Sequence, residues 1–324
     1  MDSEIGLGNR SDGDNSKDSK PNYRASLFRF YNPSQFSSPS GSFGNNFDLS
    51  SWIGFGELMT ADLWRAVLAE FVGTMIFAML NIGFPTQTLA VDGLANGWAW
   101  WMLIQIFGPI SGGHFNPLIT FSTVCTGTTS IARFIGYFFA QCLGSFLSGL
   151  AISRIFRTAG ALTVMPCSYY NDNIDGGQYV GFSIIFNVFV LAAIHSFGLD
   201  ARQSSYNGPI YTSFAISFTL GIAIWASGSF TLLVDEVSNP SPTTYGINWG
   251  YNPAFCFAYQ EIQNNANENA YPDNLENASG LAFAGVFISS LIYAVIHYVL
   301  FVPVNHHNDL KEEADRNGRR LKHM

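Results

Sequence analysis

Two short apolar segments that each begin with Asn-Pro decide how this chain folds. The first is Asn116-Pro117-Leu118-Ile119-Thr120-Phe121 and the second is Asn252-Pro253-Ala254-Phe255-Cys256-Phe257. Asn is a good helix N-cap, and Pro at the first helical position lacks only an N–H group that would have no partner there. With about 10 residues each, the segments are too short to cross a bilayer, which takes about 20 helical residues. We predict two re-entrant half-helices; an ordinary capped surface helix is the alternative for either segment taken alone.

Six longer apolar stretches surround these segments. They cover residues 66–84, 94–110, 134–152, 179–199, 209–234 and 281–304, and each is close to the length of a transmembrane helix. The Asn-Pro segments follow the second and the fifth stretch, so they occupy equivalent places in two halves of three crossings. Because three is odd, the halves must have opposite orientation, which is typical of an inverted repeat with its site near the midplane. The predicted fold class is an all-α integral membrane protein.

Charged residues are concentrated at the two ends of the chain. Of 38 Asp, Glu, Lys and Arg residues, 12 lie in residues 1–60 and 9 in residues 304–324, and no lysine lies between Lys20 and Lys311. A soluble domain is about 25% charged, so the middle of the chain is not a soluble domain. The net charge of −8 and the lack of a basic patch in the sequence exclude nucleic acid as a partner.

These patterns divide the chain into three parts. Residues 1–60 are predicted to be a disordered cytoplasmic tail, residues 61–304 the membrane domain, and residues 305–324 a second cytoplasmic tail. If all six stretches cross, 13 basic residues lie on the side of the termini and only Arg154 and Arg157 lie on the other. The positive-inside rule therefore places both termini in the cytoplasm, and it does not distinguish the plasma membrane from an intracellular membrane.

Half-helices that enter from opposite faces would bring two helix N-termini together near the midplane. Each N-terminus carries roughly half a positive elementary charge, so cations and protons would be repelled there. The side-chain amides of Asn116 and Asn252 can donate hydrogen bonds to the oxygen of a small neutral molecule. This arrangement predicts a pore that passes uncharged, hydrogen-bonding solutes and blocks ions.

The sequence resembles the aquaporins, or major intrinsic proteins, over residues 63–304. The strongest matches are Ser111-Gly112-Gly113-His114-Phe115-Asn116-Pro117-Leu118 and Asn252-Pro253-Ala254, which correspond to the family's two Asn-Pro-Ala boxes, supported by Ala69-Glu70-Phe71-Val72-Gly73-Thr74 and Gln141. The resemblance implies an aquaporin-like bundle of six transmembrane helices and two re-entrant half-helices in the lipid bilayer. It also implies a pore in each protomer, lined at the midplane by the two boxes, and a homotetramer. Leu118 departs from the alanine that the family has there.

Four residues are expected to hold the half-helices in place. A carboxylate inside a membrane span is costly and marks a site by default, so we expect Glu70 to accept hydrogen bonds from the first half-helix loop; a proton relay is the alternative. The resemblance places Gln141 in the same support. His114 is expected to order the loop, with pH sensing as the alternative. Ser183-Ile-Ile-Phe-Asn187 stands near the position where the family has a glutamate, which implies weaker support for the second half-helix, or support by hydroxyl and amide groups instead.

The resemblance also implies a narrow ring that selects the solute. The family has an arginine after the second box, a histidine in the fifth crossing and an aromatic residue in the second. Here the matching positions are Phe255, Ile224 and Asn96, and Trp249 is expected to form the fourth wall. Exchange of arginine for phenylalanine removes five donors and a fixed charge, so the ring is predicted to be apolar, with Asn96 as its main hydrogen-bonding group. Such a ring favours solutes with carbon surface, whereas its large side chains favour closure by dewetting.

Together these features predict a passive channel for water, small uncharged solutes such as glycerol, or both, which excludes ions and protons. The alternative is a poorly conducting adhesion or scaffold protein with the same fold, because Trp249 and Phe255 crowd the ring. An ion-coupled transporter would need more intramembrane charge than Glu70. We expect no enzymatic activity, no cofactor and no metal, because the histidines do not have the spacing of a metal site.

Two further expectations concern residues outside the predicted ring. The four cysteines, Cys125, Cys142, Cys167 and Cys256, are expected to be packed free thiols, since only Cys167 falls in an external loop and has no obvious partner there. Asn277-Ala278-Ser279 is a glycosylation sequon on the external side, and chance occurrence is the alternative.

Overall fold

The computed structural model describes residues 49–83, 89–156, 167–170, 174–199, 201–233, 247–264, 275–277 and 279–301. The predicted C-terminal tail, residues 305–324, and the first 48 residues of the predicted N-terminal tail lie outside the described residues.

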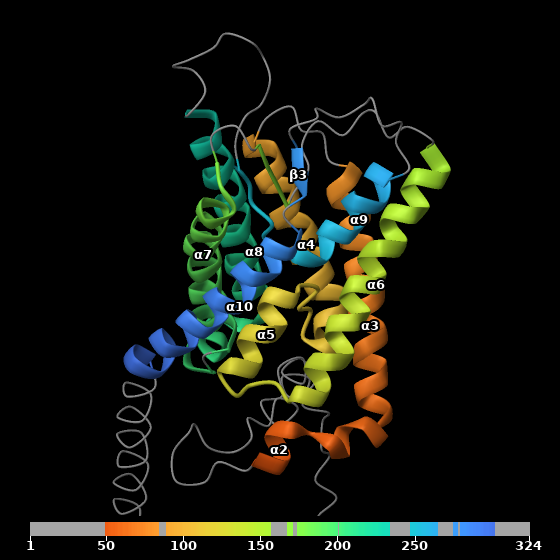
Figure 1. Cartoon of the computed structure of the whole chain (residues 1–324). Helices are drawn as coiled ribbons and strands as arrows, with labels where there is room; N and C mark the ends of the chain where they lie inside the picture. Colours follow the sequence, from red (N-terminus) through yellow and green to blue (C-terminus); the bar gives the residue numbers. More distant parts are fainter. Residues whose placement is uncertain are drawn as a thin grey trace, which may run out of the picture.

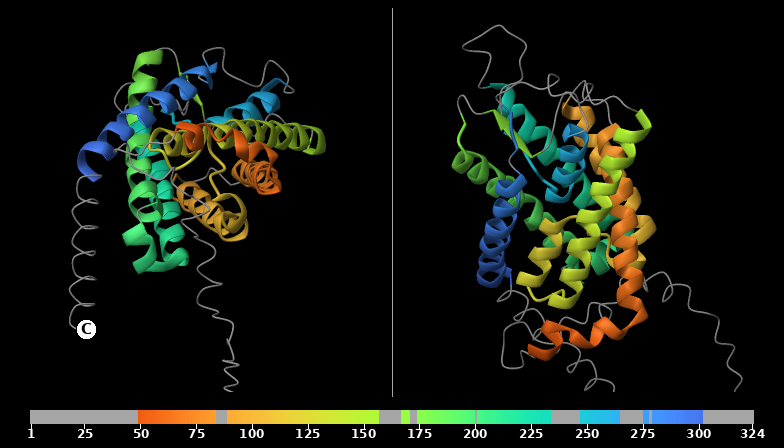
Figure 2. Two further views of the ribbon diagram at one scale, coloured as in Figure 1. Left: turned by 90° about the horizontal axis from the view of Figure 1, so that it is seen from below. Right: turned by 45° about the vertical axis from the view of Figure 1, so that its right-hand side comes forward.

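Among the described residues, six long helices form the bundle that Figures 1 and 2 show. They are α3 (Ala61–Gly83), α4 (Leu89–Ser111), α6 (Ile131–Phe156), α7 (Gly176–Ala193) with its π-helical end η4 (Ile194–Leu199), α8 (Ala201–Leu233), and α10 (Ser279–Ile296) with its π-helical end η6 (His297–Phe301). All of these except α4 combine the length and the hydropathy of a membrane span. α4 is as long as α3, with 23 residues, but it carries Asp92 and Asn96 among its apolar residues. The predicted all-α membrane fold is confirmed.

Two short helices enter the bundle from opposite ends. α5 (Pro117–Cys125) follows α4 in the chain, and α9 (Pro253–Asn264) follows α8. In Figure 1, α9 lies in the half of the molecule that carries β3, and α5 lies in the half that carries α2. Their first residues lie next to each other, because Asn116 and Asn252 each donate a hydrogen bond to the loop before the other half-helix. The predicted pair of half-helices is therefore present.

The packing contacts repeat between the two halves of the chain. α3 packs against α4 and α6, and α7 packs against α8 and α10 in the same way. α6 contacts α9 of the second half, α10 contacts α5 of the first half, and α4 packs against α8. This exchange of half-helices between the halves is the contact pattern of an inverted repeat.

Small residues allow the long helices to lie close together. A Cβ atom on Gly97 of α4 would lie 2.8 Å from the backbone oxygen of Ser217 in α8. On α6, a Cβ atom on Gly144 would lie 3.2 Å from the backbone nitrogen of Met75 in α3. Side chains at these positions would separate the helix pairs, so the small residues determine the interhelical distance.

A small sheet, which was not predicted from the sequence, lies at one end of the bundle. Its strands are β1 (Ser168–Tyr170), β2 (Ile247–Asn248) and β3 (Leu275–Asn277), in the antiparallel order β2-β1-β3. Ser168 is paired with Asn248 on one side and with Asn277 on the other. The strands come from three loops far apart in the sequence, so no local pattern indicates them. Asn277, the predicted glycosylation residue, lies in β3, and its modification stays a prediction.

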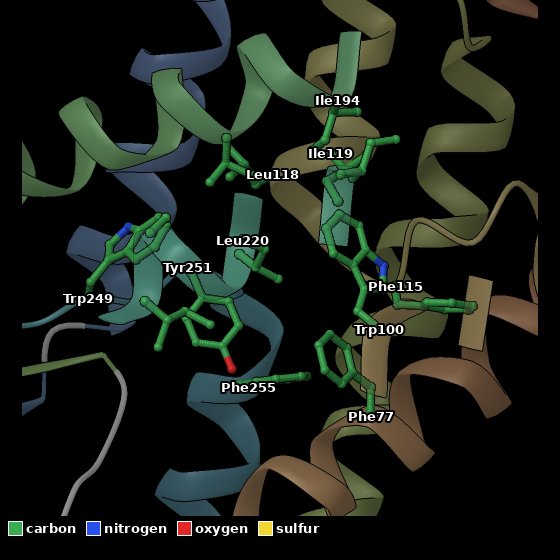
Figure 3. Packing of buried hydrophobic residues seen from close by; sticks show 14 of the residues in the cluster. Phe77, Trp100, Phe115, Leu118, Ile119, Ile194, Leu220, Trp249, Tyr251 and Phe255 are labelled. Atoms are coloured by element: carbon green, nitrogen blue, oxygen red, sulfur yellow. The ribbon is translucent and has the colours of Figure 1, made fainter. Parts of the chain in front are cut away.

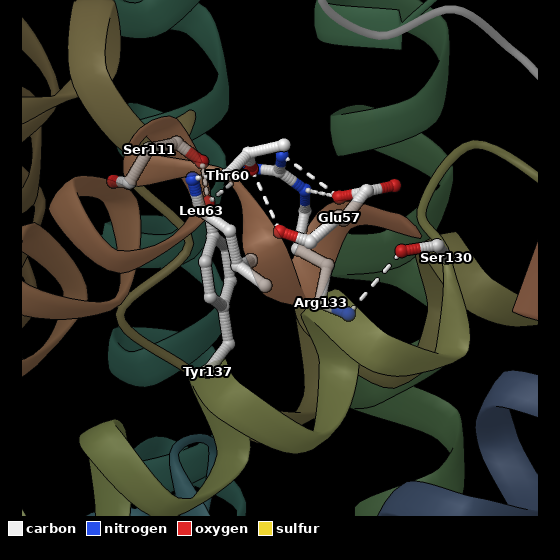
Figure 4. A network of polar contacts seen from close by, with 7 residues as sticks. All are labelled: Glu57, Thr60, Leu63, Ser111, Ser130, Arg133 and Tyr137. Atoms are coloured by element: carbon white, nitrogen blue, oxygen red, sulfur yellow. Dashed lines mark hydrogen bonds and ion pairs between the residues drawn. The ribbon is translucent and has the colours of Figure 1, made fainter. Parts of the chain in front are cut away.

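The prediction of a disordered tail over residues 1–60 is wrong for its last part. This part forms α2 (Leu49–Ile53) and the 3₁₀-helix η2 (Phe55–Met59), with α2 at the end of the molecule opposite β3 in Figure 1. Glu57 of η2 makes an ion pair with Arg133 of α6, at 3.0 Å, as Figure 4 shows. Contacts with the bundle order the segment, and a low local hydrophobicity does not reveal such contacts.

Candidate functional site

The two Asn-Pro boxes meet inside the bundle. The Oδ1 atoms of Asn116 and Asn252 each accept a hydrogen bond from the backbone amide two residues later, at 2.9 Å and 3.2 Å, so each side chain caps its own half-helix. Asn116 Nδ2 donates to the carbonyl oxygen of Tyr251, and Asn252 Nδ2 donates to that of Phe115, both at 2.8 Å. An amide nitrogen carries two N–H groups, so each asparagine has a second donor that these bonds do not use.

The other residues of the boxes pack around this contact. Pro117 and Pro253 are the first residues of α5 and α9. Leu118 and Ala254, which occupy the third position of each box, are buried. The N-terminal ends of two half-helices, each with a partial positive charge, therefore face the same place. Such a site can hydrogen-bond the oxygen of a neutral molecule and disfavours a cation.

Glu70 holds the first loop through four hydrogen bonds. Its Oε1 accepts from the Ser111 hydroxyl at 2.6 Å and from the His114 amide at 3.0 Å. Its Oε2 accepts from the Phe115 amide at 2.6 Å and from Gln141 Nε2 at 2.8 Å. The carboxylate is fully buried, so these four donors replace the water that an exposed carboxylate would bind. Glu70 thus holds the first loop, as we expected. Gln141 donates a hydrogen bond to Glu70, so it belongs to the same support.

His114 is tied into the same loop. Its Nδ1 lies 3.2 Å from Thr120 Oγ1, which also accepts a hydrogen bond from Gln141 Nε2 at 2.9 Å. The imidazole packs edge-on against the Tyr137 ring, with 5.5 Å between the ring centroids. Protein groups on several sides therefore orient this buried histidine, as a loop-ordering role requires, and pH sensing stays a prediction.

The second loop is supported differently. Ser183 Oγ, at the position where the family has a glutamate, hydrogen-bonds to no part of the second loop among the described residues. One turn further along α7, Asn187 Oδ1 accepts a hydrogen bond from Trp249 Nε1 at 3.1 Å. A support through the Ser183 hydroxyl is therefore not what the structure shows, and the amide one turn away makes the contact instead.

A disulfide adds a covalent support, and the expectation that all four cysteines are free thiols is wrong. Cys167 and Cys256 are bonded across 89 residues of sequence, whereas Cys125 and Cys142 are free. Cys256 lies in α9, inside the membrane domain. For this reason the sequence did not indicate it as a partner for Cys167, which lies in a predicted external loop. Cys167 directly precedes β1, and Cys256 lies in the first turn of α9, so the bond ties α9 to the sheet.

Three of the four predicted ring residues, Phe255, Trp249 and Ile224, belong to one buried hydrophobic cluster, which Figure 3 shows in part. Phe255 packs edge-on against Phe77 of α3, with 5.0 Å between the ring centroids. Trp249 lies against Phe186 of α7 at 5.3 Å, and Ile224 of α8 belongs to the same hydrophobic cluster. The aromatic side chains of Phe255 and Trp249 thus pack against the surrounding helices, and a selecting ring formed by these residues stays a prediction.

Asn96, the fourth ring residue, has its hydrogen bonds taken by protein groups. Its Nδ2 donates to the backbone oxygen and to the carboxylate of Asp92, at 3.0 Å and 2.9 Å. Its Oδ1 accepts from Asn81 Nδ2 at 2.7 Å and from the Tyr251 hydroxyl at 2.9 Å, and Asn81 Oδ1 accepts from the Tyr259 hydroxyl at 2.7 Å. We did not predict these hydrogen bonds. The available signal in the sequence was the presence of polar side chains, such as Asn81 and Asn96, inside predicted spans.

A comparison with known families identifies the chain. Residues 57–233, more than half of its length, match the family described as Major intrinsic protein. The chain belongs to this family. The match begins in η2 and ends with α8, so it includes the first box and the residues that support it. The resemblance found in the sequence is therefore confirmed.

Similar curated proteins are named as aquaporins or as a major intrinsic protein. The chain is 29% identical to aquaporin-4 of Bos taurus over 188 residues, which cover 53% of this chain and 56% of that protein. It is 31% identical to the lens fiber major intrinsic protein of Gallus gallus over 182 residues, with coverage of 53% and 69%. It is 29% identical to aquaporin PIP2-7 of Arabidopsis thaliana over 266 residues, with coverage of 76% and 84%. The chain spans about half the length of the aquaporin-4 relatives that it matches.

A solved structure supports the major intrinsic protein fold. The X-ray structure of the aquaglyceroporin from Plasmodium falciparum matches with a TM-score of 0.56 and 17% sequence identity. The match covers 75% of this chain and 98% of that chain. At this identity the likeness concerns the fold alone.

Removal of the disulfide is expected to destabilise this major intrinsic protein. Cys256→Ser should lower the thermal unfolding midpoint of the purified protein in detergent, because loss of a native disulfide typically costs about 2–5 kcal/mol. Cys142→Ser, at a free cysteine, is the matched control and should change the midpoint much less. A reducing agent should bring the wild type to the midpoint of Cys256→Ser. Equal midpoints for all three proteins, with and without reductant, would contradict a stabilising bond.

Proposed function

We propose that this major intrinsic protein is a passive channel for water, small uncharged solutes, or both. The observation that carries the proposal is the meeting of two half-helix N-termini, where Asn116 and Asn252 each keep one amide N–H beyond those bonded to the protein. Two such donors can stabilise a neutral oxygen as it loses its water shell. The names of the similar proteins, which are aquaporins and an aquaglyceroporin, agree with water and glycerol-like solutes.

Exclusion of ions and protons follows from the same site. The two half-helix dipoles put partial positive charge at the meeting point, which repels cations. Phe255 follows the second box directly, so no fixed charge at this position adds to the barrier. We propose that exclusion depends on the half-helix ends and the two asparagines rather than on a charged ring.

The membrane arrangement is proposed on the charge pattern and on family membership. Both termini would be cytoplasmic, which places the sheet outside and α2 at the cytoplasmic surface. A homotetramer, with one pore in each protomer, is the assembly that the resemblance implies. We expect no enzymatic activity.

A second candidate function is a membrane adhesion or scaffold protein that conducts poorly. Packing of the ring favours it: Phe255 is 0% exposed and Trp249 is 4% exposed. A side chain that lines a water-filled path is accessible to water on one face, whereas these side chains are almost inaccessible. The structure is therefore compatible with a low flux, and flux measurements distinguish the two functions.

A stopped-flow shrinking assay on proteoliposomes tests the proposal. Vesicles with the purified protein should shrink faster than protein-free vesicles under a sucrose gradient, should re-swell faster under a glycerol or urea gradient, or both. The rates should not depend on an ion gradient, and a pH-sensitive dye inside the vesicles should show no proton flux above the protein-free rate. Rates equal to those of protein-free vesicles for every solute would favour the scaffold. A proton current would contradict the exclusion proposed for the half-helix ends.

A further inference from the structure

An apolar groove runs along the outer side of α3 and α6, which lie side by side at one edge of the bundle in Figures 1 and 2. Its volume is about 770 Å³, and no residue of the two boxes lines it. The lining side chains Leu68, Ile135, Phe139 and Leu143 are 49–66% exposed, so the groove is open on the side that faces away from the bundle. Because α3 and α6 have the length and the hydropathy of membrane spans, the groove opens into lipid hydrocarbon.

The segment formed by α2 and η2 borders one end of the groove. Figure 1 shows that this segment runs across the end of the bundle and not along α3. It is held there by the ion pair between Glu57 and Arg133, and by close packing at Gly54, where a Cβ atom would lie 2.6 Å from Ser130 Cβ. The lining side chains that the segment contributes are Ile53, Phe55 and Leu58.

The groove has the depth of one bilayer leaflet. Its lining runs from Leu63 to Phe71 on α3 and from Ile131 to Leu143 on α6, which correspond to about 12 Å and about 18 Å at 1.5 Å per residue. The hydrocarbon core of a bilayer is about 30 Å thick, so one leaflet is about 15 Å deep. A transmembrane helix of a second copy would need a contact face about twice as long as the groove. An acyl chain from the leaflet on the α2 side matches the length.

The chemistry of the lining also fits hydrocarbon. No lining side chain is charged, and the Trp64 indole supplies the single polar side-chain atom. That atom, Nε1, donates a hydrogen bond to the Leu58 carbonyl oxygen at 2.9 Å. A sterol hydroxyl inside the groove would therefore find no side-chain partner, whereas an acyl chain needs none. An empty groove would cost its walls their packing contacts on one side, and a flexible chain restores these contacts.

We propose that the groove binds one acyl chain of a bilayer phospholipid, with the headgroup of that lipid at the level of the α2–η2 segment. Trp64, 58% exposed near this end, agrees with the enrichment of tryptophan at the membrane–water interface. Because no charged side chain lines the groove, the site selects the chain and not the headgroup. The inference does not depend on the proposed channel function, since it needs only the membrane setting of α3 and α6.

A side chain placed inside the groove should displace the lipid. Gly136 lines the groove, and a Cβ atom there would lie 2.8 Å from Val67 Cγ2, so Gly136→Leu fills the space between the two helices. Gly181→Leu on α7 is the matched control, because a Cβ atom there meets no atom within 4 Å. The full chain is reconstituted with phosphatidylcholine and extracted in mild detergent, and native mass spectrometry counts the phospholipid retained per protomer. We expect Gly136→Leu to retain about tenfold less than the wild type and Gly181→Leu, and phosphatidylglycerol to be retained as well as phosphatidylcholine.

A second variant keeps the test decisive if Gly136→Leu does not fold. Phe139 is 66% exposed, so Phe139→Ala leaves the interior intact but removes one wall of the groove. It should also retain less phospholipid, whereas Phe189→Ala, at an exposed phenylalanine of α7 outside the groove, should match the wild type. Equal retention by wild type and Phe139→Ala would overturn the site.

Two other results would overturn the choice of occupant. Preferential retention of added cholesterol over phosphatidylcholine would assign the groove to a sterol. Loss of oligomers in Gly136→Leu, with no phospholipid retained by the wild type, would assign it to a second copy of the chain. All of these measurements count bound lipid or subunits and not flux, so a failed lipid site leaves the channel function standing, and a non-conducting protein can still show the lipid site.

Discussion

Glu70→Ala is expected to abolish solute permeation and to destabilise the membrane domain strongly. The Glu70 carboxylate accepts four hydrogen bonds from buried donors, two of them backbone amides of the first loop. A buried donor left without an acceptor costs about 1–3 kcal/mol, and four such donors would be left together. The sum is a large fraction of the total stability of a typical domain, about 5–15 kcal/mol. The loop should lose its conformation, and α5 should lose its position against α9.

Two other variants give this prediction its controls. Arg65→Ala changes a side chain that is 75% exposed on the same helix, and its ion pair with Asp62 is of the surface type that contributes about 0–1 kcal/mol. It should leave flux and the unfolding midpoint almost unchanged. Glu70→Gln keeps the shape but offers one acceptor oxygen instead of two, so we expect an intermediate midpoint. Thermal unfolding in detergent and flux in proteoliposomes check all three, and a Glu70→Ala protein as stable and as permeable as Arg65→Ala would falsify the supporting role.

Gly149→Ala is expected to displace the second half-helix and to reduce flux to the protein-free rate. A Cβ atom on Gly149 of α6 would lie 2.7 Å from the Cα atom and 2.8 Å from the carbonyl carbon of Ala258 in α9. These are backbone atoms, so no side chain can rotate away, and α9 itself must move. Added bulk in a well-packed interior typically costs about 1–3 kcal/mol. Because α9 begins with the second box, its displacement should also separate Asn252 from Phe115.

The same substitution elsewhere gives the matched control. A Cβ atom on Gly181 of α7 would meet no atom within 4 Å. Gly181→Ala should therefore be neutral or stabilising, by up to about 1 kcal/mol, since alanine is the better helix former. The unfolding midpoints and glycerol or water flux of the two variants form the test. Equal flux and equal midpoints for Gly149→Ala and Gly181→Ala would show that the close contact between α6 and α9 does not position the second box.

The first half of the candidate site could be predicted from the sequence because its signals are local. Asn-Pro at the start of a short apolar segment predicts a capped half-helix, and Asn116 and Asn252 both act as caps. A lone carboxylate in an apolar span needs hydrogen-bond donors. Glu70 accepts hydrogen bonds from the backbone amides of His114 and Phe115 in the first loop. The two boxes occupy matched positions in two halves of three crossings each. Because three is odd, the halves have opposite orientation, and this predicted that the boxes meet.

The rest of the site could not be predicted because its partners are distant in sequence. Cys167 and Cys256 are 89 residues apart, and neither has a local pattern that indicates a bond. Near Ser183 the sequence left weaker support or support by hydroxyl and amide groups open, and only the packed structure shows that the Asn187 amide, and not the Ser183 hydroxyl, meets the second loop. Asn96 was expected to serve a solute, yet Tyr251, 155 residues away, takes its acceptor.

The sequence by itself determined the membrane setting, the number of long helices, the two half-helices and the buried carboxylate that supports the first of them. These features depend on periodicity, on length and on the cost of burying polar groups, which each residue carries with it. Only the tertiary structure decided the disulfide, the sheet, the ordered segment before α3 and the polar cluster around Tyr251. The reason is physical: a hydrogen bond or a disulfide needs two partners at a fixed distance, and that distance exists only after the helices have packed.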